Sequence, residues 1–486
     1  MPFKSIDLRD PSAWIVGVSA LIVGASGYAL RGHELDDGLI YARYIQNLIS
    51  GNGFVYNQGE FINGLTSPLF AYLAVMPSFL FGDARYGTML ISVLAAVGTI
   101  IIVYRMTALI IDNRQIAAIS TVFAAGSGMT YINLGMEASL FTFMIGLCLY
   151  LYFKDRFFLL GICVGLAILT RPEAVFLVPA MALNTLFFKR MWPSWSCYAL
   201  PGLLIFIQLV FNSIYYDALL PSSGIAKISQ GATGHWGYSS FLFNLPTLFW
   251  YGFGLPGQMQ VFGTHVVPIL LMILAAFSFL LVQARQYLLI SVTFLGLYTG
   301  FFAVLNIPSQ WWYYAIYFTI FSTWLVLGIY WIYVQCKTEH LQAFRISCVG
   351  LFGLILIWQL TINLFVHGKT VREDYRQFGE WIAENTPTDA SIALAEIGTV
   401  GWYSQRRIID ILGLVTSGNA DFVAVGDYHS WLESHPPDYI LAQEPPRFFE
   451  QAVTLLKTER PEDLAEVVGF DFPDYKLYRY SPAESD

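Results

Sequence analysis

The feature that most constrains this chain is the recurrence of apolar segments long enough to cross a membrane. A helix needs about 20 predominantly apolar residues to span the hydrocarbon core. Eleven candidate segments lie at about 13–30, 87–110, 116–134, 138–153, 157–170, 174–188, 197–216, 266–283, 287–305, 314–334 and 346–366. Only 12% of the residues are charged, against about 25% in an average soluble domain, and the mean hydropathy is +0.56. The sequence therefore predicts a polytopic α-helical membrane protein.

The basic residues of the loops predict how the spans are oriented. Residues 68–81 are apolar but form too short a run for a full crossing, so we expect a surface or re-entrant helix there. With eleven spans and a cytoplasmic N-terminus, the inside loops carry 11 Lys and Arg residues and the outside loops carry 5. This asymmetry follows the positive-inside rule. Counting residues 68–81 as a crossing would remove it.

The composition changes after residue 366. Residues 367–486 contain 10 basic and 21 acidic residues, a net charge of −11, and no further apolar span of membrane length. A helix is expected at 375–384 and short strands at 391–395, 407–412 and 439–442. Helices that alternate with short buried strands favour an α/β domain. We therefore predict a membrane domain over 1–366 and a small α/β domain over 367–486, with the latter on the extracytoplasmic side.

Three acids stand directly after the first apolar span. Glu34, Asp36 and Asp37 lie beside the hydrocarbon region, where carboxylates are costly and usually functional. From Ile40 the apolar residues recur with helical spacing up to Gly51, which predicts an amphipathic helix with an Asp at its N-terminus. An N-cap is one ordinary use for such an Asp, but a cap accounts for only one of the acids.

Further polar side chains are expected at the same outer level of the membrane: Arg43, Glu137, Arg171, Glu173, Lys227 and His235. A carboxylate beside a sugar hydroxyl can act as a general base, and Arg or Lys can hold a phosphate. Acids and cations at a membrane surface suit a substrate linked to a lipid phosphate. The sequence has no P-loop or Gly-rich dinucleotide motif, so a nucleotide substrate is not favoured.

Each of these residues also has a structural interpretation. Glu137 can lie in the first turn of the next helix, and Arg171 with Glu173 can form an ion pair beside the helix-breaking Pro172. Lys227 can extend its side chain to the interface, and a lone loop histidine such as His235 is more often structural than catalytic. The aromatic run 311–314 is typical of an interfacial belt, and Arg406 with Arg407 is read as a solvated pair.

Several motifs together resemble a known family. The first comprises the acidic pair, Ile40-Tyr41-Ala42-Arg43-Tyr44, Gly51-Asn52-Gly53-Phe54 and Gly64-Leu65-Thr66-Ser67-Pro68. Others are Gly135-Met136-Glu137-Ala138, Leu169-Thr170-Arg171-Pro172-Glu173, Leu220-Pro221-Ser222 with Ala226-Lys227, and Ala395-Glu396-Ile397-Gly398. This pattern resembles the bacterial GT-C integral-membrane glycosyltransferases, in particular their arabinofuranosyltransferase-like branch.

The resemblance implies an enzyme that transfers a sugar, arabinofuranose as the best guess, from a polyprenyl-phosphate donor with inversion. Asp36 or Asp37 would be the general base, and the donor would be bound by Arg43, Arg171, Lys227, Glu137, Glu34 and His235. The acceptor would be a glycan, a lipid or a protein, reached from the outer face of a bacterial plasma membrane. Nucleic acid is not expected as a partner.

Two points depart from the family pattern or stay open. Many relatives carry an Arg-Tyr pair near the start of a late membrane helix, where this chain has only Trp311 to Tyr314. The sequence offers no firm set of metal ligands, and we assign no metal or cofactor. The alternative function is a transporter or flippase of lipid-linked sugars, a class that often shows internal repeats and midplane charges; neither is seen here. A scaffold protein is a third possibility.

Overall fold

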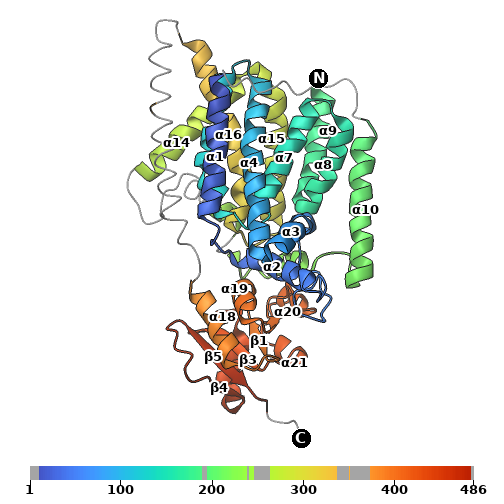
Figure 1. Cartoon of the computed structure of the whole chain (residues 1–486), viewed down its shortest axis with the longest axis vertical. Coiled ribbons are helices and arrows are strands. Elements are labelled where there is room, and N and C mark those ends of the chain that lie inside the picture. Colours follow the sequence, from blue (N-terminus) through green and yellow to red (C-terminus); the bar gives the residue numbers. More distant parts are fainter. Residues whose placement is uncertain are drawn as a thin grey trace.

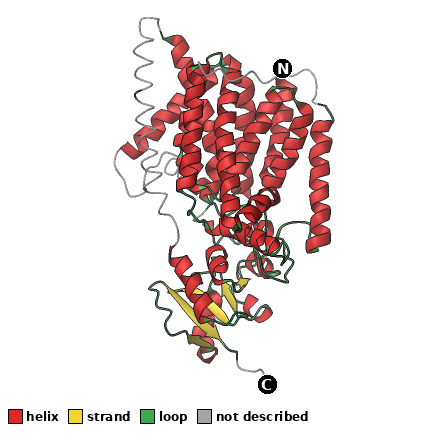
Figure 2. Ribbon diagram, in the orientation of Figure 1, coloured by secondary structure: helices red, strands yellow, loops and turns green. Residues whose placement is uncertain are grey.

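The computed structural model describes residues 10–188, 194–237, 240–245, 263–336, 350 and 373–482. Within these residues the chain forms a bundle of long helices with a small domain of helices and strands at one end (Figures 1 and 2). The fold class predicted from the sequence, a polytopic helical bundle with a C-terminal α/β domain, is confirmed. The predicted boundary at 366 and the expected span at 346–366 lie outside the described residues.

Ten predicted apolar segments coincide with helices of the bundle. These helices are α1 (Pro11–Ala29), α4 (Ala84–Ile110), α5 (Arg114–Gly126), α7 (Ala138–Phe153), α8 (Phe157–Thr170), α9 (Leu177–Phe188), α10 (Ser196–Tyr216), α14 (Gly263–Ala276), α15 (Arg285–Val304) and α16 (Ala315–Gln335). Among the described residues, five helices are long and apolar enough to cross a membrane by themselves, and others are shorter apolar helices. The number of spans therefore stays a prediction.

The outer surface of the bundle is apolar. Helix α10, at the edge of the bundle in Figure 1, exposes 62% of Phe206 and 81% of Ile214. Large exposed apolar surfaces are rare on soluble monomers. Helices also satisfy their own backbone hydrogen bonds, which a chain in lipid must do. The bundle is thus suited to a bilayer.

Helices α2 (Asp36–Ile49) and α3 (Pro68–Phe81) lie at the end of the bundle that faces the α/β domain (Figure 1). The amphipathic helix expected after the first span is α2, and it buries Leu39, Ile40, Tyr44 and Ile45. The chain enters and leaves α3 at this same end of the bundle (Figure 1). This arrangement is compatible with the surface or re-entrant helix expected from its length, which stays a prediction.

The α/β domain is built on a five-stranded sheet. Its elements are α18 (Glu373–Asn385), β1 (Ser391–Leu394), α19 (Ile397–Ser404), β2 (Arg407–Asp410), α20 (Asn419–Ala424), α21 (Trp431–Ser434), β3 (Tyr439–Gln443), α22 (Gln451–Glu459), β4 (Leu464–Glu466) and β5 (Tyr475–Tyr480). The strand order is β2-β1-β3-β5-β4. Strand β1 pairs in parallel with β2 and β3, whereas β5 is antiparallel to β3 and β4.

The two faces of this sheet enter different apolar clusters. Ile392 and Leu394 of β1 pack in one cluster with Phe378 of α18, whereas Ala393 packs in another with Trp431 of α21. Successive side chains of a strand point to opposite faces, so β1 is covered on both sides. Its fully buried apolar sequence is typical of a strand inside a parallel sheet.

The interpretation of Arg406 and Arg407 as a solvated pair is wrong for Arg406. Its side chain is 6% exposed. Its guanidinium donates to the backbone carbonyl oxygens of Ala383, Thr386 and Ser404 and to the hydroxyl of Thr386. Arg406 therefore ties the end of α18 to the end of α19. Arg407 is the exposed member of the pair and forms an ion pair with Glu60 at 2.6 Å.

Candidate active site

Arg43 joins the first loop to the α/β domain. Its Nε donates to Tyr56 O at 2.9 Å, Nη1 to Gly401 O at 2.6 Å, and Nη2 to Arg406 O at 2.6 Å and Asn57 Oδ1 at 3.3 Å. The side chain is 6% exposed. The sequence suggested Arg43 as a donor-binding residue. In the structure it is outside both cavities described below, and its three guanidinium nitrogens are already engaged by protein oxygens.

Asp36 contacts the α/β domain in a second way. Its carboxylate accepts hydrogen bonds from the backbone N–H groups of Gly398 at 3.1 Å and Thr399 at 2.7 Å, in the first turn of α19. These are donors that a helix leaves unpaired at its N-terminus. Gly398 is required here because a Cβ at this position would overlap the carbonyl group of Asp36. Asp36 thus caps a helix more than 360 residues away in sequence.

The possibility that Asp36 or Asp37 is the N-cap of α2 is therefore wrong. The N-cap residue of α2 is Leu35, and no side chain caps this end; both acids lie in the first turn. Acidic side chains in a first helical turn interact favourably with the helix dipole. The two consecutive acids have different surroundings, because Asp36 is held by α19 and Asp37 is not.

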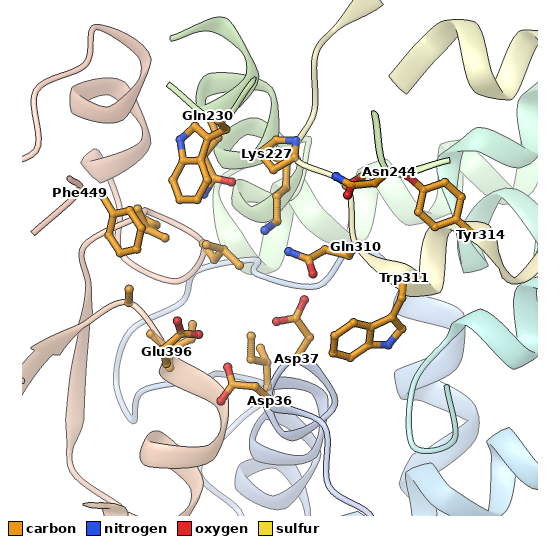
Figure 3. A pocket seen from close by; sticks show the side chains of 18 residues that line it. Asp36, Asp37, Lys227, Gln230, Asn244, Gln310, Trp311, Tyr314, Glu396 and Phe449 are labelled. Carbon is orange, nitrogen blue, oxygen red and sulfur yellow. The ribbon is translucent and has the colours of Figure 1, made fainter. Parts of the chain in front are cut away.

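Asp37 faces a polar cavity of about 440 Å³ between the bundle and the α/β domain. Among the described residues, no hydrogen bond to its carboxylate is found. Figure 3 shows this carboxylate, the Lys227 ammonium and the Gln310 amide pointing toward one another, while the Asp36 carboxylate points toward α19. Asp37 is consequently the acid of the first loop that is open to a ligand.

Burial changes the acidity of both aspartates. Burial, together with the negative charge of Glu396, raises the pKa of Asp36 to about 7, although the N–H group of Thr399 acts in the opposite direction. Burial also raises the pKa of Asp37, while Lys227 lowers it and Glu396 adds to the rise. A carboxylate with a raised pKa is a stronger base than an ordinary one, which suits proton abstraction near neutral pH.

A second cavity, of about 290 Å³, adjoins the first and is mostly apolar. Its apolar lining includes Leu220, Ile225, Ile228, Phe301, Phe302, Ile307 and Trp312. Asp37, Ile40, Lys227 and Leu414 line both cavities. The candidate base and the amine of Lys227 therefore lie where a polar space meets an apolar one.

Lys227 lies on α11 (Ser222–Ala232). It is partly buried and lines both cavities. Within the described part of the chain it forms no ion pair or hydrogen bond, so its charge is available to a ligand. Its predicted role as a phosphate ligand stays a prediction.

Arg171, by contrast, is saturated by two acids. Its Nη1 lies 2.8 Å from Glu137 Oε1 and its Nη2 lies 2.8 Å from Glu173 Oε1, while Nε donates to Glu173 Oε2 at 3.3 Å. All three side chains are less than 10% exposed. Helix α8 ends before Arg171, and a 3₁₀ turn begins at Pro172. The predicted helix break with an ion pair is confirmed, and little hydrogen-bonding capacity of Arg171 remains for a phosphate.

Glu137 lines the apolar cavity and has a free oxygen. It occupies the N-cap position of α7, but its side chain does not cap that helix. Glu137 Oε2 and Ser223 Oγ are buried without a hydrogen-bond partner among the described residues, and both residues line the apolar cavity. Buried polar atoms are nearly always paired, so these two atoms mark a place for a polar group of a ligand.

Glu34 and His235 do not line either cavity. Glu34 forms an ion pair with Arg85 at 2.7 Å and accepts a hydrogen bond from the hydroxyl of Tyr403 in α19. His235 is exposed, and its Nδ1 lies 3.1 Å from Tyr428 Oη in the α/β domain. Both residues support contacts between the bundle and that domain, and the structural interpretation of His235 fits this position.

The polar cavity also contains polar residues that were not among the predicted site residues: Gln230, Asn244, Ser309, Gln310 and Glu396. Glu396 immediately precedes α19 and also forms an ion pair with Arg447 at 2.6 Å. It belongs to a motif noted in the sequence, which was the available signal for it. The three carboxamides have no sequence signature. Among the described residues, no group of three or more His, Cys, Asp or Glu residues is arranged to hold a metal ion.

Comparison with known structures identifies the architecture. The structure of ArnT from Cupriavidus metallidurans bound to undecaprenyl phosphate superposes with a TM-score of 0.58 at 13% identity, over 96% of this chain and 97% of that chain. The Archaeoglobus fulgidus oligosaccharyltransferase tethered to an acceptor peptide superposes with a TM-score of 0.57 at 13% identity, over 89% of this chain and 69% of that one. This chain has the GT-C fold of membrane glycosyltransferases.

Sequence comparisons agree with the GT-C assignment. Residues 66–216 match the family model described as dolichyl-phosphate-mannose-protein mannosyltransferase, and residues 364–480 match a domain of unknown function (DUF8728). The terminal β-(1→2)-arabinofuranosyltransferase of Mycobacterium tuberculosis is 26% identical over 243 residues. That alignment covers 45% of this chain, and the chain spans 39% of the length of that relative.

Proposed function

We propose that this GT-C protein transfers a sugar from a polyprenyl-phosphate donor to an acceptor hydroxyl, with Asp37 as the general base. One observation carries the proposal: Asp37 and Lys227, which form no hydrogen bond or ion pair among the described residues, lie where the polar and the apolar cavity meet. A lipid-linked sugar phosphate has the same division, since its chain is apolar and its headgroup is polar. The apolar cavity would take the first part of the lipid, and the polar cavity the donor sugar and the acceptor.

The geometry supports a single displacement. The acceptor oxygen bonds to the anomeric carbon as the bond from that carbon to the phosphate oxygen breaks. Asp37 takes the proton of the acceptor hydroxyl, and the polyprenyl phosphate leaves with the bonding electrons. Attack opposite the leaving group inverts the anomeric centre. Lys227 would stabilise the charge that develops on the phosphate, since a cation in a site of low dielectric is effective there.

The other predicted residues have supporting roles in this proposal. Asp36 positions α19 rather than reacting, because its carboxylate is occupied by two backbone N–H groups. Arabinofuranose is the proposed sugar because of the similarity to the mycobacterial arabinofuranosyltransferase. We place the reaction on the extracytoplasmic face of a bacterial plasma membrane, with the N-terminus cytoplasmic and an α/β domain over 367–486.

The test is donor consumption by the purified protein with a panel of polyprenyl-phosphate sugars that includes the arabinofuranose donor. Asp37→Asn should lower the rate about 10²–10⁴-fold, the usual contribution of a general base. Lys227→Gln should raise the KM for the donor.

Asp112→Asn is the matched control. Asp112 is an exposed residue between α4 and α5 and lines neither cavity. A folded Asp37→Asn protein with the wild-type rate would refute the assignment of the base. Binding of lipid-linked sugars without consumption of any donor would favour the flippase alternative.

A further inference from the structure

We propose that the polar cavity is an acceptor subsite selective for a neutral saccharide, bound by the carboxamides of Gln230, Asn244 and Gln310. This inference rests on the proposed function and adds the chemical class of the acceptor. The polar cavity is formed jointly by the first loop, α11, residues 308–311 and the α/β domain.

Gln230 provides the first observation. The residue is 1% exposed, lines the polar cavity, and its Nε2 has no hydrogen-bond partner among the described residues. A side-chain amide nitrogen carries two N–H donors. Leaving them unpaired in a buried position is unfavourable. A hydroxyl oxygen of a ligand in the cavity would accept these hydrogen bonds.

The second observation is that three carboxamides line one cavity. Gln310 precedes the 3₁₀ turn Trp311–Tyr314, and Asn244 ends the short helix α12 (Phe241–Asn244). Figure 3 shows the amides of Asn244 and Gln310 pointing toward the side chain of Lys227. Each carboxamide both donates and accepts hydrogen bonds without a charge. This capacity matches sugar hydroxyls, which also both donate and accept.

The charge of the cavity disfavours anionic acceptors. Asp37 and Glu396 line the cavity with Lys227, so the acids outnumber the cation, while the Asp36 carboxylate points toward α19. A phosphate or carboxylate on the acceptor would be repelled at close range, where like charges are strongly unfavourable. Arg447 compensates Glu396 from outside this cavity's lining. The lining therefore favours a neutral ligand over a uronic acid or a phosphorylated glycan.

The aromatic side chains of the lining complete the match. Trp236, Trp311, Tyr314 and Phe449 line the same cavity. Trp236 stacks on Phe449 of the α/β domain with ring centroids 5.1 Å apart, which joins the bundle side of the cavity to that domain. Aromatic rings present an apolar face beside polar groups, and a sugar ring has apolar C–H faces between its hydroxyls.

The test measures the KM values for donor and acceptor separately in Gln230→Leu. Replacing an unpaired buried amide by an apolar group of similar size is neutral or stabilising for folding. We therefore expect an unchanged or higher melting temperature, an unchanged donor KM, and an acceptor KM raised roughly fivefold to tenfold, the size of one lost hydrogen-bonding group. A structural role for Gln230 would instead lower the melting temperature.

Gln208→Leu is the matched control. Gln208 lies on α10 outside both cavities, and its amide is hydrogen-bonded to Tyr72 and Asn212. This substitution should leave the acceptor KM unchanged. The acceptor panel contains neutral oligosaccharides, uronic-acid oligosaccharides and a Ser/Thr-containing peptide. Preference for the anionic sugars or for the peptide would overturn the inference, as would an unchanged acceptor KM in Gln230→Leu. Failure to consume any donor would instead refute the proposed function.

Discussion

The substitution Arg43→Lys tests whether Arg43 holds the first loop against the α/β domain or binds a phosphate. Arg43 donates to three backbone carbonyl oxygens and to Asn57 Oδ1. A lysine keeps the charge but lacks the fork of donors. Tyr56 O also accepts from Asn47 Nδ2, and Gly401 O from the backbone N–H of Gln405, so Arg406 O is the carbonyl that the substitution leaves unpaired. An unpaired buried acceptor costs about 1–3 kcal/mol, a sizeable part of a typical domain stability of about 5–15 kcal/mol.

Hydrogen–deuterium exchange of the backbone amides of α19 is the appropriate assay, because Gly401 and Arg406 lie in or next to this helix. Even the lower bound of about 1 kcal/mol corresponds to roughly fivefold faster exchange if opening is local. Arg479→Lys is the control, since Arg479 is an exposed residue of β5 in the same domain. Unchanged exchange in α19 combined with lost binding of undecaprenyl phosphate would refute this reasoning.

Three further predictions concern the same region. Gly398→Ala should separate α19 from α2, because the added methyl group would overlap the carbonyl of Asp36. Overpacking of this kind costs about 1–3 kcal/mol or more, so we expect a lower melting temperature in detergent and a reduced transfer rate. Arg171→Leu should destabilise the bundle by about 3–5 kcal/mol, since it leaves Glu137 and Glu173 buried without a cation. Chemical unfolding measures this loss of stability, and an unchanged free energy of unfolding would contradict the ion-pair assignment. The transfer rate should fall as the pH drops through the raised pKa of Asp37, because only the ionised carboxylate accepts a proton. Lys227 lowers the pKa of Asp37 and Glu396 raises it. The acid limb of the kcat/KM profile should therefore move to higher pH in Lys227→Gln and to lower pH in Glu396→Gln. Shifts in the opposite directions would exclude Asp37 as the base.

Much of the fold could be predicted because it depends on local pattern. The membrane helices follow from long apolar runs, and α2 follows from helical spacing between Ile40 and Gly51. Strands β1 and β2 are short apolar runs bounded by turn residues. Strand β4 was missed because Leu464–Glu466 is only three residues long and mostly exposed, and β5 was missed although Tyr475–Tyr480 has aromatic residues typical of strands.

The site was harder to predict because its contacts are long-range. No spacing rule could show that Asp36 caps α19 or that Arg43 reaches Gly401, since both contacts depend on how the α/β domain docks. The chemistry of the acids and of Lys227 was visible in the sequence, and these residues do meet at one place. The carboxamides were not visible, because Gln and Asn are common surface residues whose burial is known only from the fold.

The meeting of two cavities at Asp37 and Lys227 also has a kinetic consequence. In the proposed reaction each product remains on the side from which its precursor came, so the lipid phosphate and the extended acceptor depart by separate routes. Neither product then blocks the release of the other. The polyprenyl phosphate product would then compete with the donor and not with the acceptor, and product release would have no compulsory order.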